Sequence, residues 1–167
     1  MNFVLIGGIP GAGKNWVADQ LYRQFGLPNH DIDKLSLYSG LKGEELWYAF
    51  EKQYQRQLRK KHCPGAVFTA TFRDPITRQK WLNLVEPYPY IQLSCYYIMV
   101  PLQLAIERAI NRANIDSSHP IRADVARANI TAWYDRFTSQ NNSDLYEGQW
   151  TIVQDGQQIL NDFSSRL

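Results

Sequence analysis

The sequence predicts a three-layer α/β/α fold around a five-stranded parallel sheet. Short apolar runs alternate with helical patterns along the whole chain, and strands separated by helices usually pair in parallel, with helices on both faces. The runs expected to form strands are Asn2–Gly7, Asn29–Ile32, Ala66–Thr71, Leu93–Val100 and Trp150–Val153. The segments expected to form helices are Lys14–Phe25, Gly43–Lys61, Pro75–Val85, Leu102–Ala113, Arg122–Ser139 and Gln157–Arg166. The polar stretch Ser139–Gly148 is expected to be a surface loop.

Length and composition favour a single compact domain over residues 1–167. The chain is 44% hydrophobic and 20% charged, which is ordinary for a globular protein. Its net charge of +2 is too small to imply nucleic-acid binding by itself. Cys63 and Cys95 show no metal-ligand spacing, and no internal repeat or interdomain linker is evident.

The sequence also favours a cytoplasmic protein. The chain begins with an expected strand and lacks a basic segment followed by a long apolar stretch, so we expect no signal peptide. No apolar run approaches the roughly 18 residues that a membrane span requires. Both cysteines are therefore expected to be reduced thiols.

The segment Gly8–Asn15 is the most informative part of the chain. It reads Gly-Ile-Pro-Gly-Ala-Gly-Lys-Asn, directly after the first apolar run and before a helical pattern. This is the phosphate-binding loop G-x-x-x-x-G-K-[ST] in its strand–loop–helix context, apart from the last residue. Its glycines bring backbone N–H groups close to phosphates, the following helix contributes its N-terminus, and Lys14 supplies a mobile positive charge. We therefore expect the chain to bind a nucleoside triphosphate, with ATP as the expected nucleotide.

Asn15 departs from this motif. A serine or threonine hydroxyl normally meets Mg²⁺ at that position. The carbonyl oxygen of Asn15 could coordinate Mg²⁺ directly, or bind it through a water molecule, or the protein could bind nucleotide without performing chemistry. The sequence leaves these three alternatives open.

Asp33 is the first candidate for activating a phosphate acceptor. It follows the short apolar strand end near Ile32, where ligands meet the carboxyl edge of a parallel sheet. A carboxylate there could orient or deprotonate a hydroxyl and help to hold Mg²⁺. Asp31 is the alternative, because two residues along a strand point to the same side. Either aspartate could instead cap a helix or shape a turn.

Three further segments resemble a known family. They are His30–Leu35, Thr69–Trp81 and Pro101–Arg112, the last followed by His119–Ile121. With the phosphate-binding loop, they resemble the small P-loop kinases of the polynucleotide-kinase type, related to zeta toxins, a group that includes sugar, antibiotic and nucleoside kinases. The resemblance implies a P-loop NTPase domain with a small helical lid at about residues 108–121.

The same resemblance assigns acceptor activation to Asp33 but is incomplete near it. After the third strand the family commonly has Asp-Thr-Asn or Asp-Ala-Thr, where this chain has Ala70-Thr71-Phe72. Three residues after Asp33 the family often has arginine, and this chain has Ser36.

Arg108 and Arg112 are the expected lid cations. They are four residues apart in a helical pattern and so lie on one face, from which they could stabilise charge on a transferring phosphoryl group. The alternative is a solvated helix face paired with Glu107 or Asp116. Arg127, on the next expected helix, could face the same cleft.

A further expected helix has two alternative roles. The expected helix Gly43–Lys61 could stack single-stranded bases and meet phosphates, or simply pack an amphipathic face and complement its helix dipole. Its aromatic residues are Trp47, Tyr48, Phe50 and Tyr54, and its basic residues are Lys52, Arg56, Arg59, Lys60 and Lys61.

Asp74 before Pro75 is typical of a helix cap. Arg73 and Arg78, on either side of that cap, could touch an anionic acceptor or lie on the surface. In this fold class, the turn Gln154–Gly156 usually lies beside the purine base.

These observations predict an ATP- and Mg²⁺-dependent phosphotransferase. Residues expected to perform transfer are Lys14, Asp33, Arg108 and Arg112. Residues expected to bind the nucleotide are Gly8, Pro10, Gly11, Ala12, Gly13, Lys14, Asn15, Trp16 and Arg108, and those expected at the metal are Asn15 and Asp33. The resemblance favours a polynucleotide 5′-hydroxyl as acceptor. The alternatives are a small nucleoside, sugar or antibiotic acceptor, or a nucleotide-binding regulatory protein without catalysis.

Overall fold

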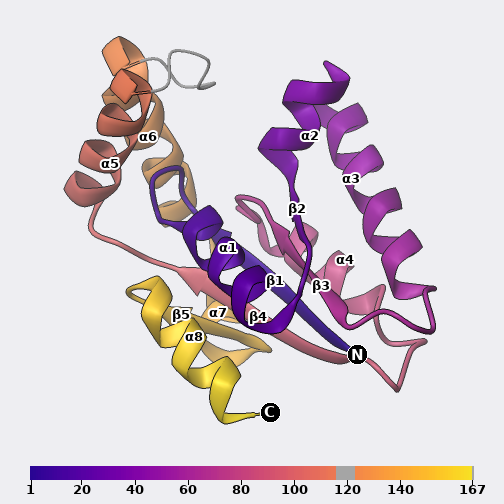
Figure 1. Ribbon diagram of the computed structural model, residues 1–167. Coiled ribbons are helices and arrows are strands. Elements are labelled where there is room, and N and C mark those ends of the chain that lie inside the picture. The colour runs from indigo at the N-terminus through magenta and orange to yellow at the C-terminus, as the bar shows by residue number, and fades with distance from the viewer. Residues whose placement is uncertain (116–122, 167) are drawn as a thin grey trace.

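A computed structural model describes residues 1–115 and 123–166, and these form a twisted parallel sheet between two layers of helices (Figure 1). The strands are β1 (Asn2–Gly8), β2 (Asn29–Asp31), β3 (Gly65–Thr69), β4 (Gln92–Ile98) and β5 (Trp150–Val153). They pair in the order β2-β3-β1-β4-β5, and every pair is parallel. The predicted five-stranded parallel sheet is confirmed. Because β1 lies at its centre, the loop that follows β1 emerges from the middle of the sheet.

The helices cover both faces of this sheet. They are α1 (Lys14–Phe25), α2 (Ile32–Ser39), α3 (Gly43–Leu58), α4 (Pro75–Asn83), α5 (Leu102–Ile115), α6 (Ala123–Thr138), α7 (Ser143–Glu147) and α8 (Gly156–Ser165). Alternate β1 residues enter different cores: Val4 and Ile6 pack with α1, α5 and α8, whereas Phe3 and Leu5 pack with α3, α4 and α7. The period-two alternation of a strand therefore builds the three predicted layers.

Two short helices were not predicted. α2 begins directly after β2, where a strand end and a turn were expected, and α7 lies inside the predicted loop Ser139–Gly148. Both are too short to show a clear hydrophobic periodicity. α2 has a local cap at Asp31, and α7 is tied to the rest of the fold through Asp144.

Several element ends differ from the prediction by one to three residues, and two of these differences affect predicted segments near the site. β3 ends at Thr69 rather than Thr71, and the chain then turns through Phe72, a buried non-glycine residue with a positive φ of 40°. α3 ends at Leu58, so Lys60 and Lys61 lie beyond the helix. The predicted basic cluster is therefore only partly helical.

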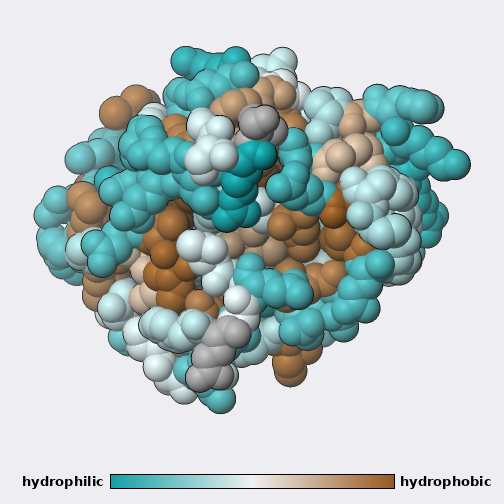
Figure 2. Space-filling model, turned by 90° about the horizontal axis from the view of Figure 1, so that it is seen from below, coloured by the Kyte–Doolittle hydropathy of each residue, from teal (hydrophilic) through white to brown (hydrophobic). Residues whose placement is uncertain are grey.

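The phosphate-binding loop lies between two raised pairs of helices. In Figure 1, α2 and α3 extend past the carboxyl ends of the strands on one side, and α5 and α6 do so on the other. Viewed from below in Figure 1, hydrophobic residues gather near the middle of a mainly hydrophilic surface (Figure 2). No helix within the described ranges is both long and apolar enough to cross a membrane.

Candidate phosphate-binding site

The Gly8–Asn15 loop has the backbone geometry of an anion cradle. Gly8, Gly11 and Gly13 have positive φ values of 147°, 83° and 98°. A Cβ on Gly11 would lie 2.2 Å from the backbone oxygen of Ala105 in α5. Only glycine fits there, so the loop sits directly against the first turns of α5. Gly13 caps α1, whose first N–H groups have no side-chain cap and point toward the loop.

Lys14 is folded back onto its own loop. Its Nζ donates hydrogen bonds to the carbonyl oxygens of Gly8, at 2.8 Å, and Ile9, at 3.1 Å. Burial lowers the pKa of Lys14, and Arg112 lowers it further, while Asp33 and Asp31 oppose the shift. The lysine therefore lies among two carboxylates and an arginine that come from other elements.

A cavity of about 210 Å³ brings most of the predicted catalytic residues together. The loop contributes Lys14 and Asn15, α2 contributes Asp33, and α5 contributes Arg112. The rest of its lining comes from Pro10, Gly11, Gly13, Thr71, Ala109 and Trp133. Thr71 and Trp133 were not predicted at the site. No local motif marks either residue, since Trp133 reaches the cavity only through the packing of α6 beside α5.

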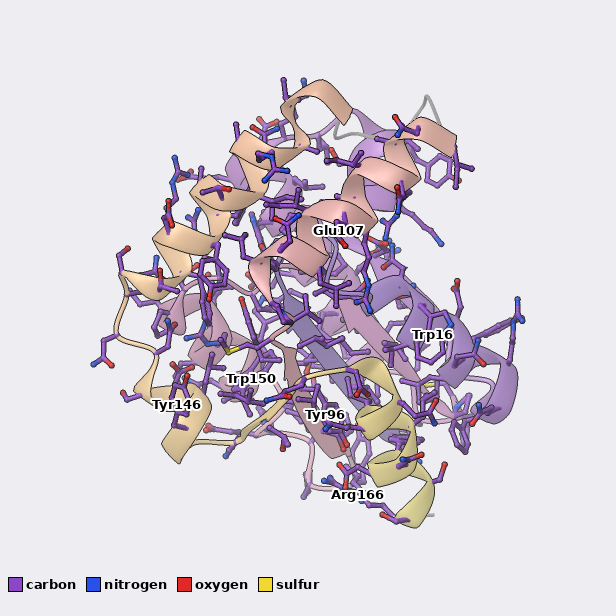
Figure 3. The ribbon with its side chains drawn as sticks, turned by 90° about the vertical axis from the view of Figure 1, so that its left-hand side faces the viewer. Trp16, Tyr96, Glu107, Tyr146, Trp150 and Arg166 are labelled. Carbon is purple, nitrogen blue, oxygen red and sulfur yellow. The ribbon has the colours of Figure 1, made fainter. Side chains whose placement is uncertain are left out.

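A second cavity, of about 470 Å³, adjoins the other side of the loop. It is lined by Gly11, Ala12, Gly13, Trp16, Arg108, Arg112, Asp155, Gly156 and Gln157. Its volume is in the range of small-ligand sites. Trp16 is half exposed and lies on α1 close to Gly156 at the start of α8 (Figure 3). Of the predicted base-side turn Gln154–Gly156, Asp155 and Gly156 line this cavity.

The two lid arginines take different positions along α5. Arg108 lines only the larger cavity, whereas Arg112 lines both. Glu107, one of the two acidic partners considered for these arginines, accepts a hydrogen bond from Gln103 at 3.0 Å. Figure 3 labels Glu107 on α5. Arg127 lies on the exposed face of α6 and is not among the lining residues of either cavity. The remainder of the predicted lid, including Asp116 and His119, lies outside the described residues.

Asp31 and Asp33 have distinct environments at the start of α2. Asp31 is the N-cap, and its Oδ1 accepts a 2.7 Å hydrogen bond from the backbone N–H of Asp33. Asp31 is only 6% exposed, and its Oδ2 is buried without a hydrogen-bond partner. Asp33 lies in the first turn of α2 rather than in a loop and lines the smaller cavity.

The carboxylate oxygens of Asp31 and Asp33 are suitable ligands for Mg²⁺. The cation prefers hard oxygen ligands and is commonly held by one or two carboxylates together with substrate phosphates and water. The orphaned Oδ2 of Asp31 is a buried acceptor of that kind, and Asp31 and Asp33 are both close enough to Lys14 to raise its pKa against the effect of burial. Within residues 1–115 and 123–166 there is no group of three His, Cys, Asp or Glu residues that could hold a metal alone. A cation here would depend on the phosphates for much of its coordination.

Arg73, which precedes α4, and Arg78, which lies within it, have different roles. Arg78 is fully buried, so the predictions that it touches an acceptor or lies on the surface are both wrong. Arg73 places its guanidinium 4.9 Å from the ring of Trp133 and thereby supports the cavity wall. Asp74 caps α4 by accepting a 2.8 Å hydrogen bond from Thr77 N–H, as predicted.

The aromatic residues of α3 are largely structural. Phe50 and Tyr54 are completely buried and pack against Phe68 and Trp81. They cannot stack on nucleic-acid bases without opening the core. Trp47 and Tyr48 line a separate hollow between α3 and α4. The amphipathic-core interpretation of this helix fits its two central aromatic residues.

Comparison with known proteins identifies the fold. No protein-family model and no curated protein matches the sequence. A gluconokinase from Sinorhizobium meliloti has a similar structure, with a TM-score of 0.61 and 15% identity over 96% of this chain and 88% of that one. A shikimate kinase from Acinetobacter baumannii, in complex with shikimate, gives 0.59 and 18% over 99% and 93%. A sugar kinase from a Janibacter species gives 0.63 and 12% over 99% and 93%. The chain therefore has the fold of the small P-loop kinases.

Proposed function

We propose that this protein is a kinase that transfers the γ-phosphate of ATP to a hydroxyl group of a small molecule. The observation that carries the proposal is the convergence of Lys14, Asp33 and Arg112 around one small cavity at the phosphate-binding loop. A cation from the loop, a carboxylate from α2 and a cation from α5 are the groups that phosphoryl transfer requires at one point.

Each residue has a role in the transfer. The loop N–H groups and the N-terminus of α1 would hold the phosphate chain, and Lys14 would follow the moving phosphoryl group. Asp33 would orient the acceptor hydroxyl and take its proton as the hydroxyl oxygen bonds to the γ-phosphorus. The bond from that phosphorus to the bridging oxygen breaks, and ADP leaves. Arg112, with Arg108 beside it, would stabilise the charge on the transferring oxygens.

The larger cavity is the proposed nucleoside site. Its position beyond Gly13, next to Trp16 and Arg108, is where the rest of ATP would extend from phosphates held in the loop. Bound Mg²⁺ would neutralise phosphate charge, with Asp31 and Asp33 as the carboxylates available to hold it.

The residues around the site favour a small acceptor over a polynucleotide. Trp133 and Thr71 belong to the lining of the smaller cavity, and the ring of Trp133 is backed by Arg73. Phe50 and Tyr54, two of the four aromatic residues that could have stacked on nucleic-acid bases, are buried. The similar solved structures are also named for small-molecule kinases.

The free thiols Cys63 and Cys95 fit the proposed cytoplasmic setting.

Asn15 and Ala70 favour a second candidate function. They stand where a metal-binding hydroxyl and a carboxylate were expected, so a protein that binds nucleotide without transferring phosphate is the alternative.

The test is transfer of labelled γ-phosphate from ATP to a panel of sugars, sugar acids, other polyols and nucleosides, alongside a 5′-hydroxyl oligonucleotide. We expect label on a small molecule with the natural protein and none with Lys14→Ala. Label only on the oligonucleotide would establish the polynucleotide reaction instead. ATP binding without label on any acceptor would support the nucleotide-binding alternative.

A further inference from the structure

Asn15 is engaged by a buried hydroxyl from the neighbouring strand. Thr69, the last residue of β3, is 1% exposed, and its Oγ1 lies 3.4 Å from Asn15 Oδ1 and 3.4 Å from Asn29 Oδ1. These distances are long for a hydroxyl donor, as expected when one proton is shared between two acceptors. A buried hydroxyl that donated to neither would be left unsatisfied, at a cost of about 1–3 kcal/mol. In this arrangement the carbonyl side of the Asn15 amide faces Thr69 and β3.

This contact determines what Asn15 presents to the phosphate cavity. The oxygen and nitrogen of a carboxamide lie on opposite sides of the group, so an oxygen turned toward β3 leaves Nδ2 on the other side. Asn15 lines the smaller cavity. Its Nδ2 donates to no residue in the described ranges and is not among the buried polar atoms without a partner. The group available at the cavity is a hydrogen-bond donor.

A donor at this position differs from the usual arrangement in P-loop proteins. There, the loop Ser or Thr hydroxyl and an aspartate on a nearby strand hold Mg²⁺. In this chain the loop ends in a carboxamide, and β3 is followed by Ala70 and Thr71. The first carboxylate after β3 is Asp74, which is used as the cap of α4. Both usual metal-holding positions are therefore occupied by neutral side chains.

We propose that Asn15 binds the phosphate chain of the nucleotide directly through Nδ2 and is not a direct ligand of Mg²⁺, with Thr69 as the residue that positions it. This inference rests on the proposed binding of ATP. An N–H donor gains from a bare phosphate oxygen whether or not a cation is present, whereas a carbonyl oxygen, which cannot donate, gains only through the cation. The contribution of Asn15 to ATP affinity should consequently not depend on Mg²⁺.

The test measures the ATP dissociation constant by titration calorimetry in excess Mg²⁺ and again in EDTA. The quantity of interest is the factor by which Mg²⁺ tightens binding. We expect this factor to be about tenfold larger for Asn15→Thr, which restores the metal-binding hydroxyl, than for the natural protein, because changes next to a metal ligand typically alter metal affinity by about 10–100-fold. Thr69→Val frees the Asn15 oxygen and should also raise the factor, whereas Thr69→Ser keeps the hydroxyl and should not.

A matched control is Thr151→Val, an exposed position on β5, the strand that pairs with β4 at the edge of the sheet. It should leave the factor unchanged. The inference is overturned if the natural protein depends on Mg²⁺ as strongly as Asn15→Thr, or if Thr69→Val behaves like the natural protein. Absence of ATP binding in both media would instead defeat the proposed function, so the two failures are distinguishable.

Discussion

Asp31 and Asp33 are separated by one residue, but the structure gives them different tasks. Asp31 is buried and stabilises the first turn of α2 as its cap, and Asp33 faces the cavity beside Lys14. The cap positions Asp33 because its hydrogen bond is made to the backbone N–H of Asp33 itself. Of the two carboxylates, Asp33 is therefore the one that lines the cavity in which we propose that the acceptor hydroxyl binds.

Exchange of each aspartate for asparagine tests this division. Asp33→Asn removes the proton acceptor, and we expect kcat to fall by about 10²–10⁴-fold with ATP affinity largely kept. Asp31→Asn retains a good cap, so the folded protein should be nearly as stable. Steady-state kinetics and urea unfolding of both variants would decide. Full transfer activity in Asp33→Asn, with loss in Asp31→Asn, would reverse the assignment.

The burial of Lys14 leads us to predict that nucleotide binding depends on pH. Only its ammonium form attracts phosphate, and burial lowers its pKa in the free protein. As pH rises, Lys14 loses its proton at a lower pH than an ordinary lysine does. The ATP affinity should therefore begin to decrease at a pH below the range in which lysines usually titrate. The measurement is the ATP dissociation constant against pH, corrected for ATP ionisation. A flat profile through that range would contradict the prediction, and Lys80→Met, on exposed α4 surface, serves as the control.

At the scale of elements, one buried arginine joins α4, α7 and the turn after β3. Arg78 donates hydrogen bonds to the carbonyl oxygens of Phe72 and Arg73, at 2.9 and 2.8 Å. It also pairs with Asp144, at 2.6 Å, and contacts Asn142. Phe72 has the positive φ, so these bonds hold the turn in a conformation that a phenylalanine rarely adopts. The Trp133 wall of the cavity depends on this turn through Arg73.

Loss of Arg78 should therefore destabilise the fold. Arg78→Met removes all of these bonds and leaves Asp144 and two backbone carbonyls without their partner, and we expect a loss of about 3–5 kcal/mol in the free energy of unfolding. Lys80→Met breaks the more exposed Lys80–Glu51 pair and should cost less than about 1 kcal/mol. Urea unfolding gives both values. Equal losses in the two variants would show that Arg78 is not a structural centre.

At the scale of the whole molecule, the smaller cavity, where we propose that phosphate is transferred, is shared among several elements. The smaller cavity takes residues from the loop, α2, α5 and α6, which stand on opposite sides of the carboxyl edge of the sheet (Figure 1). A bound nucleotide would add contacts between these parts that the free protein lacks. Ligand binding should consequently stabilise the entire fold rather than one loop.

Thermal unfolding measures this effect. At an ATP concentration of about 100 times the dissociation constant, linkage supplies about 2.7 kcal/mol. For a chain of this size we expect the Tm to rise by about 5–10 °C. Lys14→Ala, which loses the phosphate contact, should show no rise at the same concentration. A rise of similar size in that variant would indicate ATP binding elsewhere on the molecule.

The sequence by itself determined the features that arise from neighbouring residues. The phosphate-binding loop, the whole of α1 and the five strands depend on local hydrophobic periodicity and on glycines that permit positive φ. Asp74 as the cap of α4 is local in the same way. The resemblance to P-loop kinases rests mainly on the loop, and the fold comparison bears it out at the level of fold.

Only the tertiary structure decided which distant residues meet. The order β2-β3-β1-β4-β5 places β3 beside β1, and this brings Thr69 to Asn15 across 54 residues of sequence. The fold also buries Arg78 against Asp144 and brings Trp133 and Asp33 to the lining of one cavity. A single sequence shows no local periodicity or motif for such pairs, because their contacts arise from strand order and helix packing. The phosphate-binding character of the loop could therefore be predicted from consecutive residues, whereas the residues that contact the loop from other elements were determined by the fold.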